Sequence, residues 1–197
     1  MDYALGAWTI LDEPRVLAGR DADLGRFPRV ALCHQPTALE PMLRLSEHLG
    51  GPKLYIKGDD CTGLATGGNK TGKLEFLVGE ALQQKADMLV TQGAVQSNHV
   101  RQTAAAACPV GLRCHVLLER REPDRSADYE QTGNVFLDTV FGATHEFRPP
   151  ALDMNTEALS VVDRLRSEGH RPYFIPGGGS KATGALGYVA CAQEIVR

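Results

Sequence analysis

From Lys53 onward, short apolar runs alternate with longer stretches in which apolar residues recur at helical spacing. The short runs predict strands, and the longer stretches predict helices. The predicted strands are 53–57, 88–91, 114–118, 144–147 and 173–175. The predicted helices are 74–82, 99–107, 134–141, 155–168 and 183–196. Short apolar strands joined by helices predict an α/β fold, with a parallel sheet and helices on both faces.

Three loops each follow a predicted strand and precede a predicted helix. They are residues 61–69, which are small, 92–98, which are polar, and 177–180, which hold three glycines. Because ligands of parallel sheets bind beyond the carboxyl ends of the strands, we expect the three loops to gather at one edge of the sheet. The pattern alone therefore predicts a ligand site there.

Composition narrows the class of protein. Hydrophobic residues make up 43% and charged residues 23% of the 197 residues, as is typical of a globular chain. The formal net charge of −3 gives no basic face for nucleic acid. No apolar run approaches the roughly 20 residues of a membrane span. We expect neither a nucleic-acid partner nor a membrane partner.

The cysteines and the first residues bear on the compartment. The chain has five cysteines, an odd number with no C-x-x-C pair, which fits neither a disulfide framework nor a zinc site. We expect buried free thiols in a reducing cytoplasm and no metal. Residues 1–23 carry scattered acids and lack the apolar core of a secretion signal, so we interpret them as a poorly ordered lead-in.

The segment Thr66-Gly67-Gly68-Asn69-Lys70-Thr71 places a lysine at the first turn of a predicted helix. The two glycines allow the backbone to pass close to a ligand. The partial positive charge of a helix N-terminus disfavours a protonated ammonium, so Lys70 is expected to lose its proton easily. An amine of this kind can form a Schiff base with an aldehyde.

This segment has two other interpretations. An exposed lysine at a helix start stays open on spacing alone. A phosphate-binding loop of the pattern G-x-x-x-x-G-K-[ST] is a near match from Gly63 to Thr71, but Asn69 is inserted before the lysine. No predicted strand ends in a magnesium-binding aspartate either, so the phosphate-binding loop is rejected.

Longer motifs resemble a known family. The segments 56–64, 67–77 (G-G-N-K-T-G-K-L-E-F-L) and 92–105 (Q-G-A-V-Q-S-N-H-V-R-Q-T-A-A) closely resemble the family of 1-aminocyclopropane-1-carboxylate (ACC) deaminase and D-cysteine desulfhydrase. Segments 133–135, 172–180 and 183–188 agree with it. Within this family the motif sequences most resemble those of L-cysteate sulfo-lyase, notably at Cys61-Thr62-Gly63-Leu64. The resemblance runs from about Leu24 to the end.

The resemblance implies the pyridoxal-phosphate (PLP) fold shared with the β subunit of tryptophan synthase, PLP fold type II. Residues 24–70 and 181–197 would then form part of a large PLP-binding domain, and 71–180 a small α/β domain. Because the helix pattern breaks off at Arg197, we expect the large domain to be incomplete. The family resemblance also implies that the protein forms a homodimer.

The resemblance also implies roles for single residues. Lys70 would bind PLP covalently, with Gly68 and Asn69 beside the cofactor. Asn98 would hydrogen-bond the 3′ oxygen of the ring, and Ser97 would act in catalysis next to the substrate. Backbone N–H groups at the helix start would receive the carboxylate of a small amino acid. They belong to Gln96, Ser97, Asn98 and His99.

The implied reaction eliminates a sulfur group from Cβ of a cysteine-like amino acid. L-Cysteate would give pyruvate, sulfite and ammonia, and D-cysteine would give pyruvate, sulfide and ammonia. The alternative is a non-catalytic remnant of the family that acts, if at all, as a binding domain.

Some of these residues also have purely structural interpretations, and three positions differ from the family pattern. Ser97 and Asn98 are also typical helix caps, and His99 is also typical of a partner for backbone or solvent. Gly58, Gly72 and Thr132 stand where the family pattern has arginine, arginine and asparagine. We expect Gly72 to fall in a helix interior, where it costs roughly 1 kcal/mol relative to alanine.

Overall fold

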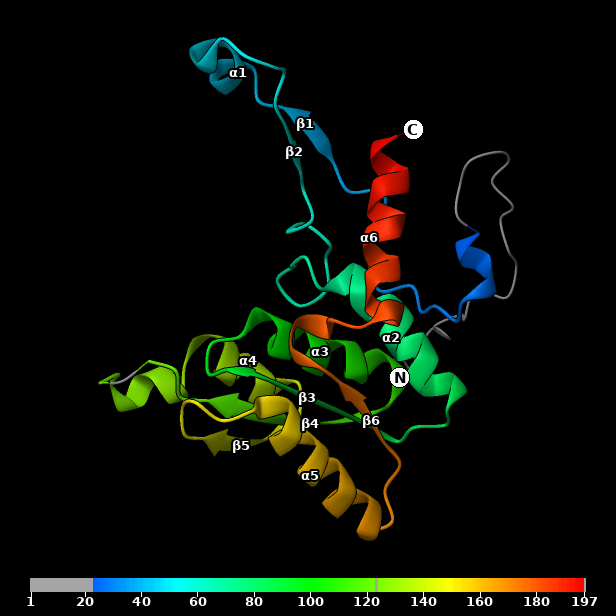
Figure 1. The fold of residues 1–197 in the computed structure, drawn as a ribbon, viewed down its shortest axis with the longest axis vertical. Helices are drawn as coiled ribbons and strands as arrows, with labels where there is room; N and C mark the ends of the chain where they lie inside the picture. The colour runs from blue at the N-terminus through cyan, green and yellow to red at the C-terminus, as the bar shows by residue number, and fades with distance from the viewer. Residues whose placement is uncertain (1–22, 123, 197) are drawn as a thin grey trace, which may run out of the picture.

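The computed structural model describes residues 23–122 and 124–196, so the expected lead-in, apart from its last residue, lies outside them. A parallel sheet of four strands forms the centre of the molecule, in the order β5-β4-β3-β6 (Figure 1). The strands are β3 (Met88–Ala94), β4 (Arg113–Glu119), β5 (Thr144–Arg148) and β6 (Pro172–Ile175). The predicted α/β class and parallel sheet are confirmed.

Helices cover both faces of this sheet, as predicted. On one face lie α2 (Thr71–Gln83), α3 (Asn98–Ala107) and α4 (Gly133–Val140), and on the other lies α5 (Met154–Ser167) (Figure 1). Successive strand residues point to opposite faces. Leu89 therefore packs in the core under α2 and α3, whereas its neighbour Val90 packs in the core under α5.

The last helix, α6 (Ala182–Ile195), packs against α2. The two backbones meet at Gly72 and Gly187, where a Cβ on Gly187 would lie 2.5 Å from the Gly72 carbonyl oxygen. A close approach of this kind needs a residue without a side chain. The predicted division of the chain into two domains stays a prediction.

A separate arm projects from the body of the molecule (Figure 1). It consists of β1 (Leu39–Pro41), α1 (Leu43–Leu49) and β2 (Tyr55–Lys57), with β1 and β2 paired antiparallel. The strand predicted at 53–57 exists, but its place in the parallel sheet was wrong. A short apolar run does not reveal its neighbours, and here the neighbour is β1, which was not predicted.

The remaining differences are local. β3 continues through Ala94 and pairs with β4 up to Glu119, so the predicted turn at 92–98 shrinks to the residues between Ala94 and Asn98. All five cysteines are free thiols, as predicted, but only Cys114 is buried, and Cys61 and Cys108 are exposed. Short 3-10 helices lie at Leu24–Arg26, Cys108–Val110, Ala127–Glu130 and Gly177–Gly179. Within residues 23–122 and 124–196, no helix is both long and apolar enough to cross a membrane.

Candidate active site

The three loops predicted to gather do lie together. The Asn98 side-chain amide donates to Asn69 Oδ1 at 3.4 Å, which joins the second loop to the first. A Cβ on Gly178, in the third loop, would lie 3.9 Å from Lys70 Cε. The prediction is therefore confirmed, although the first loop arrives from β2 on the arm and not from a strand of the parallel sheet.

Lys70 is the N-cap of α2 and is partly buried. Its Nζ donates to Asn69 Oδ1 at 3.0 Å, and its backbone N–H donates to Gln102 Oε1 at 3.0 Å. These contacts join Lys70 to the loop before it and to α3. The amine is accessible and is held next to amide groups.

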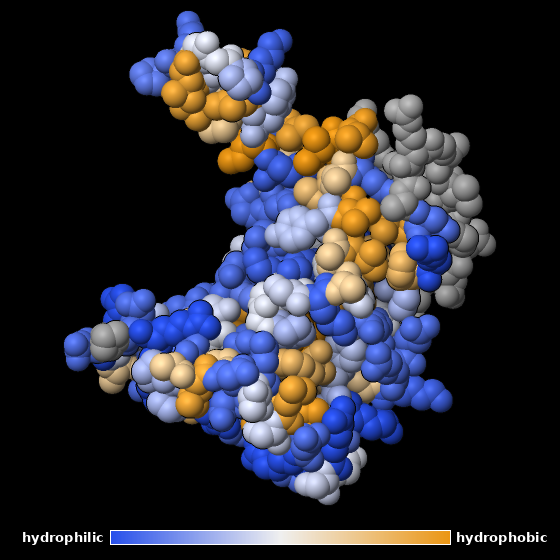
Figure 2. All heavy atoms as spheres, in the orientation of Figure 1, coloured by the Kyte–Doolittle hydropathy of each residue, from blue (hydrophilic) through white to orange (hydrophobic). Residues whose placement is uncertain are grey.

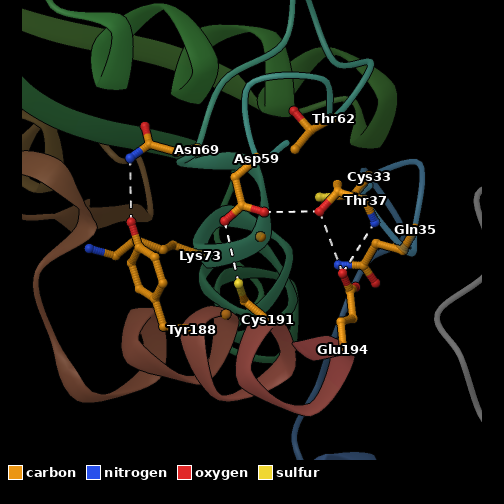
Figure 3. A pocket seen from close by; sticks show the side chains of 12 residues that line it. Cys33, Gln35, Thr37, Asp59, Thr62, Asn69, Lys73, Tyr188, Cys191 and Glu194 are labelled. Atoms are coloured by element: carbon orange, nitrogen blue, oxygen red, sulfur yellow. Dashed lines mark hydrogen bonds between the residues drawn. The ribbon is translucent and has the colours of Figure 1, made fainter. Parts of the chain in front are cut away.

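Asn69 connects the polar groups of the cluster. Its Oδ1 accepts from both Lys70 Nζ and the Asn98 amide, and its Nδ2 donates to the Tyr188 hydroxyl at 3.4 Å (Figure 3). The structure thus brings together three of the residues singled out from the sequence, Asn69, Lys70 and Asn98. Tyr188 reaches the cluster from α6.

The two glycines before Asn69 are required by the protein itself. Gly68 has φ +134°, and a Cβ there would lie 2.4 Å from Gln102 Nε2. Gly67 has φ +78°, and its Cβ would lie 1.9 Å from the Asp60 carbonyl oxygen. The close approach that we attributed to a ligand is therefore already made to Asp60 and Gln102.

Ser97 caps α3. Its Oγ accepts from the Val100 N–H at 3.3 Å, and its own N–H donates to the Ala94 carbonyl at 2.9 Å. Asn98 and His99 begin the helix. The N–H groups of a first helical turn have no acceptor within the helix, so these two can receive an anion. The capping interpretation of Ser97 is confirmed.

The Gln96 side chain is directed to the start of α4. Its amide donates to the carbonyl oxygens of Tyr129 at 2.6 Å and Thr132 at 3.0 Å, and its Oε1 accepts from the Asn134 N–H at 2.8 Å. These bonds order the segment leading into α4. The side chain therefore does not join the Lys70 cluster, and only its backbone remains for the predicted contact.

His99 is buried, with 3% of its surface exposed. Its Nε2 lies 2.9 Å from Thr91 Oγ1. Burial, followed by the charges of Lys70 and Lys73, lowers the pKa of His99 to about 3, so the ring is neutral near pH 7. Its side-chain partner is a buried threonine, and the interpretation as a partner for backbone or solvent was wrong.

Lys73 belongs to the site but was given no role from the sequence. Its Nζ donates to the Gly178 carbonyl at 2.6 Å and lies 5.7 Å from the centre of the Tyr188 ring. Burial, and then the neighbouring charge of Lys70, lowers the pKa of Lys73. Residues three apart share a helix face, so its spacing from Lys70 was the available signal.

Two residues of α3 were also missed. Gln102 bonds the Lys70 loop as described, and the Arg101 guanidinium donates to the carbonyl oxygens of Ala65 and, at 3.0 Å, Gly67. Arg101 also donates to Asn134 Oδ1 at 2.8 Å. Both lay within a quoted motif. Gln102 stands four residues after Asn98 and so on its face of the helix.

An open groove adjoins the cluster (Figure 3). Asn69 and Lys73 line it, together with residues of α6 such as Tyr188 and Glu194. Glu194 also forms an ion pair with Lys57 at 2.6 Å. Lys70 does not line the groove, but Asn69, which accepts from Lys70 Nζ, does.

Comparison with known proteins gives consistent relatives. The family model described as "Pyridoxal-phosphate dependent enzyme" matches residues 30–197. D-cysteine desulfhydrase of Klebsiella pneumoniae subsp. pneumoniae is 49% identical over 173 residues, covering 88% of this chain and 52% of the relative. D-cysteine desulfhydrase of Serratia proteamaculans is 49% identical over 172 residues, covering 87% and 52%.

A solved structure described as an ACC deaminase homologue superposes with a TM-score of 0.78 at 39% identity, covering 88% of this chain and 51% of that one. The chain thus spans about half the length of the relatives it matches. Both comparisons agree with the fold and with the family resemblance found in the motifs. The chain belongs to the family of pyridoxal-phosphate dependent enzymes.

Proposed function

We propose that this chain carries the cofactor lysine of a PLP-dependent lyase that removes sulfur from D-cysteine, with Lys70 as that lysine. The observation that carries the proposal is the hydrogen-bonded cluster of Lys70, Asn69 and Asn98 at the start of two helices. The relatives named D-cysteine desulfhydrase, at 49% identity, support the choice of reaction.

The residues present fit PLP. An aldehyde needs a primary amine, which Lys70 supplies, and an anionic ring oxygen needs an amide donor, which Asn98 supplies. Gly178, with φ +67°, has no side chain, so the space next to Lys70 Cε that its Cβ would occupy stays open. Lys73 adds a second cation beside this space. We assign these four residues to the cofactor.

When bound, PLP supplies an electron sink for the carbanion formed at the carbon that bears the amine. Lys70 would hold PLP through its amine, and the same amine, when free, would accept the proton from that carbon. The N–H groups of Asn98 and His99 orient the substrate carboxylate at the start of α3. Loss of the Cβ–S bond then releases sulfide, and addition of water gives pyruvate and ammonia.

Substrate, assembly and compartment are further parts of the proposal. L-Cysteate, which would release sulfite, is the second substrate, because Cys61-Thr62-Gly63-Leu64 resembles the sulfo-lyase motif. We propose a homodimer in the cytoplasm, where free thiols such as Cys61 and Cys108 persist. Sulfide release from D-cysteine, compared with sulfite release from L-cysteate, would decide between the substrates.

The first experiment is to add PLP to the purified chain and to record the visible absorbance of lysine-bound PLP. We expect a band that is lost in Lys70→Ala and kept in Lys53→Ala, because Lys53 is an exposed lysine on the arm. If the native chain gives no band, the alternative of a non-catalytic binding domain replaces the proposal for this chain.

A further inference from the structure

Gln102 is a polar side chain with no exposed surface, in the middle of α3. Its Oε1 accepts from the Lys70 N–H at 3.0 Å and from Thr71 Oγ1 at 3.1 Å. Its Nε2 donates to the Asn98 carbonyl at 2.9 Å. One amide thus bonds the backbone at both predicted cofactor contacts.

The loop that carries Lys70 is held from its other side by a threonine. Thr62 Oγ1 lies 2.9 Å from Thr71 Oγ1 and donates to the Gly68 carbonyl at 3.0 Å. Gly68 packs so closely on Gln102 that no side chain fits between them. The loop is therefore fixed between Thr62 and Gln102, with little freedom to shift along α3.

We propose that Gln102 is a positioning residue, which sets the place of Lys70 relative to Asn98 and so the geometry of the cofactor site. The proposal rests on the proposed function in that Lys70 and Asn98 receive the cofactor. The bonding partners of Gln102 all belong to the two site loops or to the first residue of α2.

The amide is suited to this task for a chemical reason. It offers an acceptor to one loop and a donor to the other, and it carries no charge at any working pH. A carboxylate, at a pH high enough to ionise it in this buried position, could still accept from Lys70 and Thr71 but could not donate to Asn98. A methionine would fill the volume and make neither kind of bond. These two replacements separate the contact to the lysine loop from the contact to the α3 start.

The test begins with hydrogen exchange of the chain without PLP. We expect Gln102→Met to speed exchange of the Lys70 amide about tenfold, because its partly buried hydrogen bond to Gln102 is lost. Gln102→Glu should leave that amide near its native rate. The control is Thr103→Val, the next residue of α3, whose hydroxyl bonds the His99 carbonyl within the helix and not a site loop.

The second measurement is the PLP concentration needed for half of the visible band, with the label on Lys70 fixed by borohydride and located by mass spectrometry. We expect both Gln102 variants to need about tenfold more PLP, and Thr103→Val to match the native chain. A general loss of stability would shift all three variants together.

The proposal is overturned if exchange at Lys70 is unchanged in Gln102→Met, or if Thr103→Val disturbs Lys70 and PLP binding equally. Should Gln102→Met fail to fold, Gln102→Glu decides, and a native affinity for PLP would overturn the proposal. If the native chain binds no PLP, the proposed function fails by itself, and exchange at Lys70 still decides the role of Gln102.

Discussion

Buried charge is concentrated, at the scale of single residues, between α3 and α4. Arg101 holds the loop before Lys70, and Asp138 faces it from α4 with no exposed surface. Neither carboxylate oxygen of Asp138 has a hydrogen-bond partner among residues 23–122 and 124–196. Burial raises the pKa of Asp138 to about 7, against the opposing charge of Arg101. The folded chain therefore favours the protonated acid.

This pKa predicts how stability changes with pH. Between the ordinary value of 3.8 and about 7, the folded state binds a proton that the unfolded state has lost, so this contribution to the free energy of unfolding decreases as pH rises through that window. At about 1.4 kcal/mol per pH unit, the loss is at most about 4 kcal/mol. Asp138→Asn should remove this pH dependence. In urea unfolding, the free energy of unfolding of the variant should therefore rise relative to that of the native chain between pH 5 and pH 8.

The matched control is Asp163→Asn, which removes the same charge from an exposed site on α5. It should keep the native pH dependence. An Asp138→Asn chain whose stability follows the native curve from pH 5 to pH 8 would contradict the prediction. Burial also lowers the pKa of His99 and of His115, which adds to the pH dependence of every variant, so the difference between variants is the quantity that matters.

Sequence reasoning at this scale found the residues with the clearest chemistry. The predicted residues Lys70, Asn69 and Asn98 lie together. The reason is that Lys70 stands at the start of α2 and Asn98 at the start of α3, and both helices start at the same edge of the sheet. The direction of the Gln96 side chain was not predictable, because its partners Tyr129 and Thr132 are more than thirty residues away. Whether Ser97 also acts in catalysis stays a prediction.

The contact between α2 and α6 is the most specific packing at the scale of elements. A Cβ on Gly72 would meet Gly187 at an ordinary 3.8 Å, whereas a Cβ on Gly187 would lie 2.5 Å from the Gly72 backbone. The contact is thus unequal, although both residues are glycines in helices. We expected Gly72 in a helix interior, but it lies in the first turn of α2.

The inequality predicts opposite effects of one methyl group. Gly72→Ala should raise the free energy of unfolding by about 0.4–1 kcal/mol, because it restricts the unfolded chain and fits the folded one. Gly187→Ala should lower it by about 1–3 kcal/mol, because the two backbones must move apart. Urea unfolding of the two variants beside the native chain measures both. Equal signs would refute the unequal contact.

The strands of the parallel sheet and the helices that follow them were predictable, whereas β1 and α1 of the arm were not. The run Met88-Leu89-Val90 is apolar because both its faces are covered, and it signals a central strand. The arm has no such cover. Leu45 and Leu49 stand four residues apart, which is a helical spacing, but a helix of seven residues is too short to repeat it and so gave only a weak signal.

The whole molecule exposes more apolar surface than its sheet core requires. Figure 2 shows hydrophobic residues gathered on the arm and over α6. On the arm, six large apolar side chains are at least 40% exposed. They are Leu39, Leu43, Leu45, Leu49, Tyr55 and Ile56.

A contiguous apolar surface of this kind predicts association of the chain with itself, because burial between two copies removes it from water. Leu43 and Leu49 are the most exposed of the six, at 72% and 61%. The double variant Leu43→Gln/Leu49→Gln should remain monomeric at concentrations where the native chain associates, as light scattering or sedimentation would show. Its free energy of unfolding should change by less than about 0.5 kcal/mol per site, because surface positions contribute little.

Leu159 supplies the control for this surface. It is 48% exposed on α5, which covers the face of the sheet opposite to α2 and α3. Leu159→Gln therefore removes a comparable side chain far from the arm in the fold and should leave association unchanged. If Leu159→Gln reduces association as much as the arm variant, general hydrophobicity is responsible. If the arm variant associates as the native chain does, the proposed homodimer must form through another face.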